Sequence, residues 1–272
     1  MRLSTDTFEF LLFSTDTSFI KKADQAGVHG FIVDWENKNK NSRQKNFDTQ
    51  INNNTLQDLE RAKRSTEKII ICRVNGFHEE TEKEINLAIN AGADEIFLPM
   101  VRTPKEVLDT LNFINGRCPL NILIETRDSV KNTNELSKLP LKRIYLGLND
   151  LAIERQLDNI FTSLSDGTVE KVRSNFSIPF GFAGLTSPEL GSPIPCRLLI
   201  AEMARLNAQF TFLRRSFTKD MAKKDMGVEV PRILQALSDA KLRNPEEIEA
   251  DRQELNTFIK EWKDGFKTGE MQ

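Results

Sequence analysis

Two apolar runs of the sequence each end in a carboxylate. The run that begins at Asn121 ends in Glu125, and the run that begins at Arg143 ends in Asp150. About 25 positions separate the two carboxylates, which leaves room for one helix between two parallel strands. Both carboxylates would then emerge at the same edge of one sheet, where neighbouring strands are roughly 5 Å apart. At that spacing Glu125 and Asp150 could share one divalent cation.

Further charged side chains follow other predicted strands at the same edge. Asp34 and Glu36 follow the second strand, and Arg73 ends the third. A cation held by two carboxylates keeps open positions, and an α-keto acid could fill two of them. The cation would act as a Lewis acid when a C–C bond breaks, and Arg73 could neutralise the same oxygens. The alternative interpretation is that these charged side chains lie at the rim of the fold without a functional role.

Short apolar runs alternate with longer amphipathic stretches about eight times along the chain. This pattern predicts an α/β fold, a (β/α)8 TIM barrel, and 272 residues suit one such domain. We expect a single barrel domain over residues 1–272, with a C-terminal helical extension over about 222–272. Besides the two runs above, the predicted strands are residues 9–13, 30–34, 68–73, 95–99, 178–182 and 209–213.

Composition excludes several classes of protein. The 38 basic and 40 acidic residues leave a net charge of −2, which predicts no nucleic-acid partner and no attraction to an anionic membrane. No apolar run reaches the ~20 residues of a membrane span, and no signal peptide is recognisable. The 3 cysteines form no CxxC pair, so neither a disulfide framework nor a zinc site is indicated. We therefore expect a cytoplasmic protein.

Five motifs follow one another in the first part of the chain with the spacing of barrel strands. They are Val33–Asn37, Cys72–Asn75, Ala91–Met100, Ile124–Arg127 and Gly147–Leu151. Together they resemble the HpcH/HpaI aldolase and citrate lyase β-subunit family over roughly residues 9–155. That family consists of pyruvate- or phosphoenolpyruvate-type TIM barrels. The resemblance implies an enzyme that cleaves or forms C–C bonds beside a carbonyl, usually with Mg²⁺ or a similar ion such as Mn²⁺.

The resemblance also implies roles for particular residues. Glu125 and Asp150 are expected to bind the metal, and Arg73 to contact the oxygen of a keto acid or acyl group. The backbone N–H groups around Leu148 and Asn149 are expected to hold the substrate carboxylate. A small-molecule keto acid or acyl compound is the implied substrate. A homo-oligomer, either a trimer or a hexamer, is the implied assembly.

Two departures from the family pattern bear on the chemistry. Asn37 stands where the family carries histidine or aspartate, and an amide has no pKa suited to moving a proton. The acid/base role is therefore lost, or is filled by Glu36 or metal-bound water. The eighth predicted strand ends in Arg214 and Arg215. Arg214 could bind a phosphate or a second carboxylate of the substrate, or it could pair with a carboxylate at the rim.

Three functional hypotheses remain open. The first is a Mg²⁺- or Mn²⁺-dependent carbon–carbon lyase or aldolase, with Arg73, Glu36 and Asn37 as the candidate catalytic positions. The second is an inactive barrel that retains metal and carboxylate binding and serves as a sensor or assembly subunit. The third is a phosphate-handling isomerase or mutase that uses the loops after strands seven and eight, including residues 181–188. The signatures GxSxG, HExxH, GxGxxG and the Walker P-loop are absent from the sequence.

Overall fold

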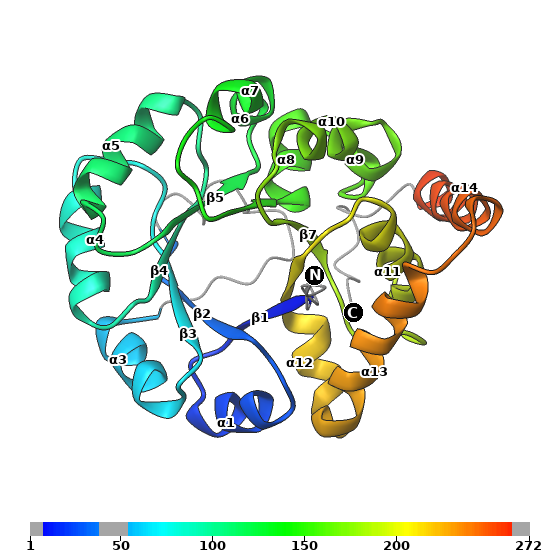
Figure 1. Ribbon diagram of the computed structural model, residues 1–272, viewed down its shortest axis with the longest axis horizontal. Coiled ribbons are helices and arrows are strands. Elements are labelled where there is room, and N and C mark those ends of the chain that lie inside the picture. Colours follow the sequence, from blue (N-terminus) through cyan, green and yellow to red (C-terminus); the bar gives the residue numbers. More distant parts are fainter. Residues whose placement is uncertain (1–7, 38–53, 263–272) are drawn as a thin grey trace, which may run out of the picture.

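Eight parallel strands close into a barrel in the computed structural model, which describes residues 8–37 and 54–262. Each strand pairs with its neighbours in chain order, and β8 pairs with β1 (Figure 1). The predicted TIM barrel is therefore confirmed. The strands are β1 Glu9–Phe13, β2 Gly30–Asp34, β3 Ile69–Arg73, β4 Glu95–Leu98, β5 Leu120–Ile124, β6 Arg143–Leu146, β7 Phe180–Gly184 and β8 Phe210–Leu213.

The seventh strand lies two residues further along the chain than the sequence predicts. It begins after Pro179, whose ring nitrogen has no hydrogen to donate to a neighbouring strand. Its register against β8 shifts between Gly181 and Gly184, and Ala183 has a φ of 53°. Residues 183 and 184, which the sequence places in the loop after the strand, belong to the strand, because an irregular, glycine-containing strand end has the composition of a turn.

Helices surround the barrel and connect successive strands. The start of α5 is capped by its own sequence: Thr103 accepts a hydrogen bond from the Glu106 N–H, and Pro104 is the first helical residue. The helices are α1 Thr17–Gln25, α3 Leu56–Ser65, α4 Thr81–Asn90, α5 Pro104–Ile114, α6 Arg127–Lys131, α7 Thr133–Leu136, α8 Leu148–Arg155, α9 Thr162–Ser165, α10 Thr168–Asn175, α11 Cys196–Arg205, α12 Arg215–Met221, α13 Met226–Ala240 and α14 Pro245–Glu261.

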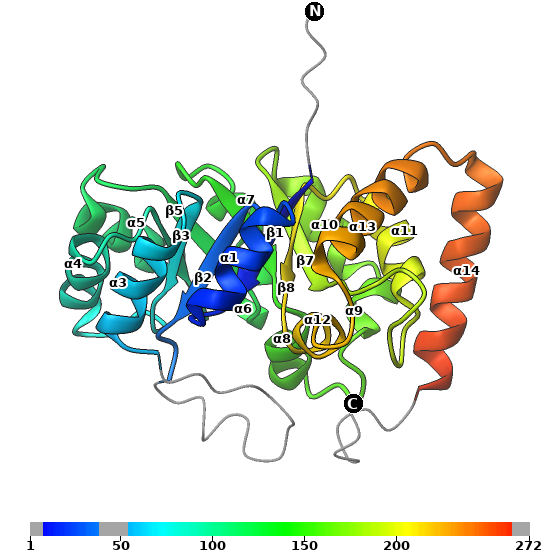
Figure 2. The ribbon, with the colours of Figure 1, turned by 90° about the horizontal axis from the view of Figure 1, so that it is seen from below.

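The last two helices occupy different places around the barrel. α13 packs against both α11 and α1, so it closes the ring of helices, whereas α14 packs on the outer side of α11 (Figures 1 and 2). Residues 263–272 of the predicted extension lie outside the described residues. The division of the chain into a barrel and an extension stays a prediction. Among the helices of residues 8–37 and 54–262, none has the length and apolar character needed to cross a bilayer.

Aromatic side chains fill the interior of the barrel. Phe212 contacts Phe13, Phe97 and Tyr145, with ring centroids 5.2, 5.4 and 3.6 Å away. Leu11, Ile32, Ile71, Leu123 and Phe210 complete this inner cluster, and a larger apolar layer lies between the strands and the helices. The interior of the barrel is thus a packed core, as in other TIM barrels.

A network of charged side chains closes the end of the barrel at which the strands begin. Arg143 forms ion pairs with Glu9 and Glu95, and Lys142 also pairs with Glu95. The Asn121 amide donates to Glu95 Oε2 at 2.9 Å, and the Arg143 guanidinium lies 5.3 Å from the Phe210 ring. Glu95 and Arg143 are buried, and each has partners of opposite charge. We call these five polar residues the N-terminal network.

Candidate active site

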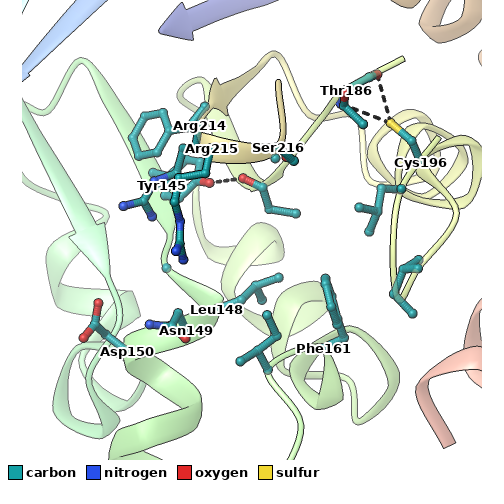
Figure 3. A pocket seen from close by; sticks show the side chains of 18 of the residues that line it. Tyr145, Leu148, Asn149, Asp150, Phe161, Thr186, Cys196, Arg214, Arg215 and Ser216 are labelled. Atoms are coloured by element: carbon teal, nitrogen blue, oxygen red, sulfur yellow. Dashed lines mark hydrogen bonds between the residues drawn. The ribbon is translucent and has the colours of Figure 1, made fainter. Parts of the chain in front are cut away.

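A cavity of about 530 Å³ opens at the other end of the barrel, where the strands terminate. The helices α8 and α12, which follow β6 and β8, both lie at this end (Figure 2). The polar residues of the lining come from the ends of several strands, as is typical of TIM-barrel active sites. They include Arg73, Glu125, Tyr145, Asn149, Asp150, Arg214, Arg215, Ser216 and Lys219, several of which are labelled in Figure 3.

The Glu125 side chain is buried and fixed by the backbone around it. It follows β5 directly, and its Oε1 accepts a hydrogen bond from the Met100 N–H at 2.8 Å. Met100 adopts a left-handed φ of 55°, which is unusual for a residue with a side chain. On the other side, a Cβ at Gly147 would lie 2.3 Å from Glu125 Oε2. A residue larger than glycine at 147 would therefore displace this carboxylate.

Like charges surround the Glu125 carboxylate. Burial raises the pKa of Glu125 to about 8, with further contributions from the negative charges of Asp150 and Glu36. Arg73 and the Met100 N–H act in the opposite direction but do not compensate fully. Gathering several carboxylates in a buried place is unfavourable unless a proton or a cation neutralises them.

Asp150 reaches the cavity from the first turn of α8. Gly147 precedes this helix, and Leu148, Asn149 and Asp150 form its first residues. Asp150 is half-buried, and all three residues line the cavity. The structure therefore brings the two predicted metal ligands and the two predicted carboxylate-binding positions to one place. The N-terminal turn of a helix such as α8 favours negatively charged ligands.

Arg73 is held rigidly at the inner wall of the cavity. Its Nε and Nη2 donate to the two oxygens of Asp34 at 2.8 and 2.7 Å, and Nη1 lies 3.2 Å from Glu36 Oε2. The guanidinium also lies 5.0 Å from the Phe13 ring. All three charged side chains are buried. Arg73 thus lines the cavity, while Asp34 accepts two of its hydrogen bonds and Glu36 forms an ion pair with it. Its contact with a substrate oxygen stays a prediction.

Glu36 and Asn37 point to different places although they are adjacent in the chain. Glu36 is buried beside Arg73 and within electrostatic reach of Glu125. Asn37 is exposed, and its N–H donates to Asn75 Oδ1 at 3.0 Å. It lines a separate cavity of about 340 Å³ together with His78. Of the two predicted acid/base positions, the structure brings only Glu36 to the carboxylate cluster.

Arg214 and Tyr145 complete the floor of the cavity. Arg214 is half-buried and lies 5.0 Å from the Phe13 ring, which Arg73 also contacts. Burial and the positive charge of Arg73 lower the pKa of Arg214, so an anion bound beside these two guanidiniums would be stabilised. Tyr145 donates its hydroxyl hydrogen to the Ala183 carbonyl (Figure 3). Sequence analysis missed Tyr145, although a single tyrosine within an apolar strand is a recognisable signal.

The carboxylates at this end suit a hard divalent cation. Mg²⁺ is commonly bound by one or two carboxylates, with water and substrate oxygens filling the other positions. Glu125 and Asp150 supply such a donor set, and their mutual repulsion is what a cation would relieve. Within the described part of the chain, no group of three or more His, Cys, Asp or Glu side chains is arranged to hold a metal. A cation held by Glu125 and Asp150 alone would take its remaining ligands from water and substrate.

Comparisons with known proteins agree with this type of barrel. A family model described as phosphoenolpyruvate phosphomutase matches residues 14–156, which is more than half of the chain. The chain belongs to the phosphoenolpyruvate phosphomutase family. Members of this group of barrels are generally divalent-metal-dependent enzymes of the lyase, aldolase or mutase type, and they act on small keto acids and often oligomerise. No curated protein sequence matches the chain.

Solved structures share the fold at low sequence identity. An HpcH/HpaI aldolase/citrate lyase family protein from Burkholderia cenocepacia J2315 has a TM-score of 0.63 and 11% identity, over 80% of this chain and 92% of that one. The citrate synthase SbnG has a TM-score of 0.54 and 18% identity, over 81% and 92%. RipC from Yersinia pestis has a TM-score of 0.53 and 13% identity, over 90% and 100%. The resemblance to phosphoenolpyruvate/pyruvate-type barrels, first noted on five motifs, is confirmed.

Proposed function

We propose that this protein is a Mg²⁺- or Mn²⁺-dependent carbon–carbon lyase or aldolase that acts on a 2-keto acid or a related acyl substrate. One observation carries the proposal: Glu125 is buried at the mouth of the barrel, where burial and the nearby negative charges of Asp150 and Glu36 raise its pKa. Family membership supports a metal-dependent lyase-type activity. A cytoplasmic homo-oligomer, a trimer or a hexamer, belongs to the same proposal.

The residues around the cavity take distinct roles in this proposal. Glu125 and Asp150 would hold the divalent cation, which would supply Lewis-acid stabilisation of negative charge on the substrate. The N–H groups of Leu148 and Asn149 receive the substrate carboxylate at the start of α8. Arg73 is positioned by Asp34 and adds positive charge to the same cavity.

Glu36 is the group that we assign to proton transfer. Its carboxylate is buried beside Arg73 and approaches the Glu125 cluster, whereas Asn37 faces the other cavity and has no pKa suited to this role. Tyr145 is a weaker candidate because its hydroxyl donates to the Ala183 carbonyl and burial raises the pKa of Tyr145 further above its ordinary value. Asn37 therefore has no part in the proposed chemistry.

Calorimetric titration with pyruvate and with oxalate, in the presence and absence of Mg²⁺ or Mn²⁺, tests the proposal. We expect oxalate to bind only with metal, and we expect the heat to disappear in Glu125→Gln. Glu135→Gln, which removes an exposed carboxylate on α7, is the matched control and should bind oxalate normally. Oxalate affinity that is independent of metal, or unchanged in Glu125→Gln, would show that the site is assigned wrongly.

Turnover separates the enzyme from a barrel that only binds its ligand. The purified protein with Mg²⁺ would be incubated with 4-hydroxy-2-keto acids, and released pyruvate would be measured. We expect release by the wild type and its loss in Glu36→Gln. Metal-dependent oxalate binding without turnover of any such substrate would favour the sensor or assembly subunit instead.

A phosphate-handling mutase is the second candidate function, and one observation favours it. Three cationic side chains, Arg214, Arg215 and Lys219, line the same cavity as the carboxylates, and the matching family model carries the name of a phosphomutase. Competition distinguishes the two functions. If inorganic phosphate displaces oxalate at comparable concentration, the mutase is favoured; if phosphate has no effect, the lyase is.

A further inference from the structure

The active-site cavity has two chemically different ends. Near the barrel axis its lining carries the charges of Arg73, Glu125, Asp150 and Arg214. Away from the axis it is lined by Leu148, Ile160, Phe161, Ile194 and Leu199, which we call the apolar compartment. Figure 3 shows this division, with Asp150 and Arg214 on one side and Phe161 and Cys196 on the other. A ligand that fills the cavity must therefore match both ends.

The walls of the apolar compartment are built into the fold. Ile194 and Leu199 are buried, and Leu199 belongs to α11. Phe161 lies between α8 and α9, and its ring centroid is 5.7 Å from that of Trp262. The neighbouring Asn159 donates its amide hydrogens to the carbonyls of Ile259 and Trp262, at 2.7 and 3.0 Å. These bonds anchor the Phe161 segment to the end of α14.

Polar groups near the apolar compartment are turned toward one another. The Cys196 thiol donates to the Thr186 carbonyl at 3.1 Å and accepts from the Thr186 N–H at 3.3 Å. Burial raises the pKa of the Cys196 thiol to about 12, so this sulfur is neutral at physiological pH. The Thr186 hydroxyl donates to Asp220. The five side chains of the apolar compartment therefore offer a ligand only carbon, and the sulfur beside them is neutral. A charged group placed among these five side chains would lose its hydration without gaining a partner from them.

We propose that the substrate carries an apolar substituent, an aliphatic chain or an aromatic ring, which occupies the apolar compartment while its keto-acid group lies at the carboxylates. This inference rests on the proposed function and specifies the substrate class. A cavity of about 530 Å³ falls within the roughly 300–1,000 Å³ typical of sites for larger ligands, and a three-carbon keto acid would leave most of it unfilled. Burial of a hydrocarbon group against this apolar surface lowers the free energy of binding.

A series of oxamates tests the inference, because oxamate retains the adjacent carboxylate and carbonyl of a keto acid. Affinities of oxamate and its N-methyl, N-butyl and N-benzyl derivatives would be measured by calorimetry with saturating Mg²⁺. We expect binding to tighten roughly fourfold per added methylene, the ratio that corresponds to about 0.8 kcal/mol per buried CH₂. Oxalate, which has no substituent, is the reference for the charged end.

Two variants test whether any gain in affinity along the oxamate series comes from contacts with the apolar compartment. Phe161→Ala and Ile160→Asn should each weaken N-benzyl oxamate by tenfold or more and change oxalate binding less than twofold. Unchanged oxalate binding also shows that the variants are folded. Phe113→Ala is the matched control, because Phe113 is likewise half-buried but stacks on Phe77 away from the cavity. It should change neither affinity.

The outcomes separate this inference from the proposed function. Oxalate binding with no gain along the oxamate series would overturn the substrate class and leave the proposed function intact. Benzyl alcohol, which has no carboxylate, tests whether the apolar compartment binds a ligand when the keto-acid site does not. Its binding to the wild type and not to Phe161→Ala, without any oxalate binding, would support the compartment and overturn the proposed function. No binding of any of these probes would overturn both.

Discussion

The two ends of this barrel both bury carboxylates beside an arginine, but they neutralise them differently. In the N-terminal network, Glu95 pairs with Lys142 and Arg143 and accepts a hydrogen bond from Asn121. At the C-terminal end, Glu125 accepts a hydrogen bond from the Met100 N–H and lies within reach of two further carboxylates. Glu95 therefore has two cationic partners within the chain, whereas the pKa of Glu125 is raised, so that a proton or a cation would neutralise it. A buried carboxylate with a raised pKa is therefore the better indicator of function.

The arginine at the C-terminal end makes the contrast sharper. Arg73 is close enough to lower the pKa of Glu125, yet it donates its hydrogen bonds to Asp34 and forms an ion pair with Glu36. The positive charge is thus held to one side of the cavity. Glu125 and Asp150 remain oriented toward space in which a ligand can bind.

The largest expected effect is on stability at the N-terminal network. Glu95→Gln leaves the buried Arg143 with one carboxylate partner fewer, and breaking such buried pairs costs about 3–5 kcal/mol. We expect the free energy of unfolding in urea to fall by about that amount, with Mg²⁺-dependent oxalate binding unchanged. If the loss falls below about 1 kcal/mol, the N-terminal network does not have the structural role given to it here.

Gly147→Ala tests the C-terminal end of the barrel, where Glu125 is placed beside this glycine. The new Cβ would lie 2.3 Å from Glu125 Oε2, so the carboxylate must move. We expect metal affinity, measured by calorimetry with Mn²⁺, to drop by about 10–100-fold, the range found when support of a metal ligand is disturbed. Gly227→Ala is the control, since a Cβ there meets only Asp225, with its nearest atom at 3.2 Å. Equal Mn²⁺ affinity in Gly147→Ala and wild type would contradict the placement of Glu125.

The pH dependence of the metal-free protein should distinguish Glu125 from an ordinary carboxylate. The folded protein keeps the Glu125 proton up to about pH 8, whereas the unfolded chain releases it near the ordinary value of 4.5. Between these values the unfolded state binds fewer protons, so stability falls as pH rises, by at most about 1.4 kcal/mol per pH unit. Glu125→Gln should lack this slope. A difference between wild type and variant that stays constant from pH 5 to 8 would contradict the raised pKa.

The smallest effect is expected at Asn37. Because its side chain lines the other cavity, Asn37→Ala should leave Mg²⁺-dependent oxalate affinity within about twofold of wild type, as surface substitutions usually do. A tenfold loss of oxalate affinity would instead show that Asn37 takes part in the active site, as the sequence predicted.

The barrel and its central carboxylates could be predicted because they depend on local patterns. A carboxylate that directly ends an apolar run identifies both the end of a strand and the edge at which it emerges, as for Glu125 after β5. Asn37 shows the limit of this reasoning. It lies three residues beyond β2, where side chains no longer alternate regularly between two faces, so Glu36 is buried beside Arg73 whereas its neighbour Asn37 lines the other cavity.

The apolar compartment could not be predicted for a related reason. Phe161 lies in the connection between α8 and α9, and Ile194 lies in the connection between β7 and α11; neither segment has hydrophobic periodicity. Leu199 has the pattern of an ordinary core residue of α11. Contacts between the Phe161 segment and the end of α14 join residues about a hundred positions apart. The left-handed backbone at Met100, which directs its N–H to Glu125, likewise has no signal in a methionine.

The most direct test of the central claim is anomalous diffraction from crystals of the protein grown with Mn²⁺. We expect one strong peak between the carboxylates of Glu125 and Asp150, at roughly 2.0–2.3 Å from their oxygens, and none in the N-terminal network. A Mn²⁺ peak beside Glu95, or no peak near Glu125 at a saturating concentration of the ion, would contradict the account.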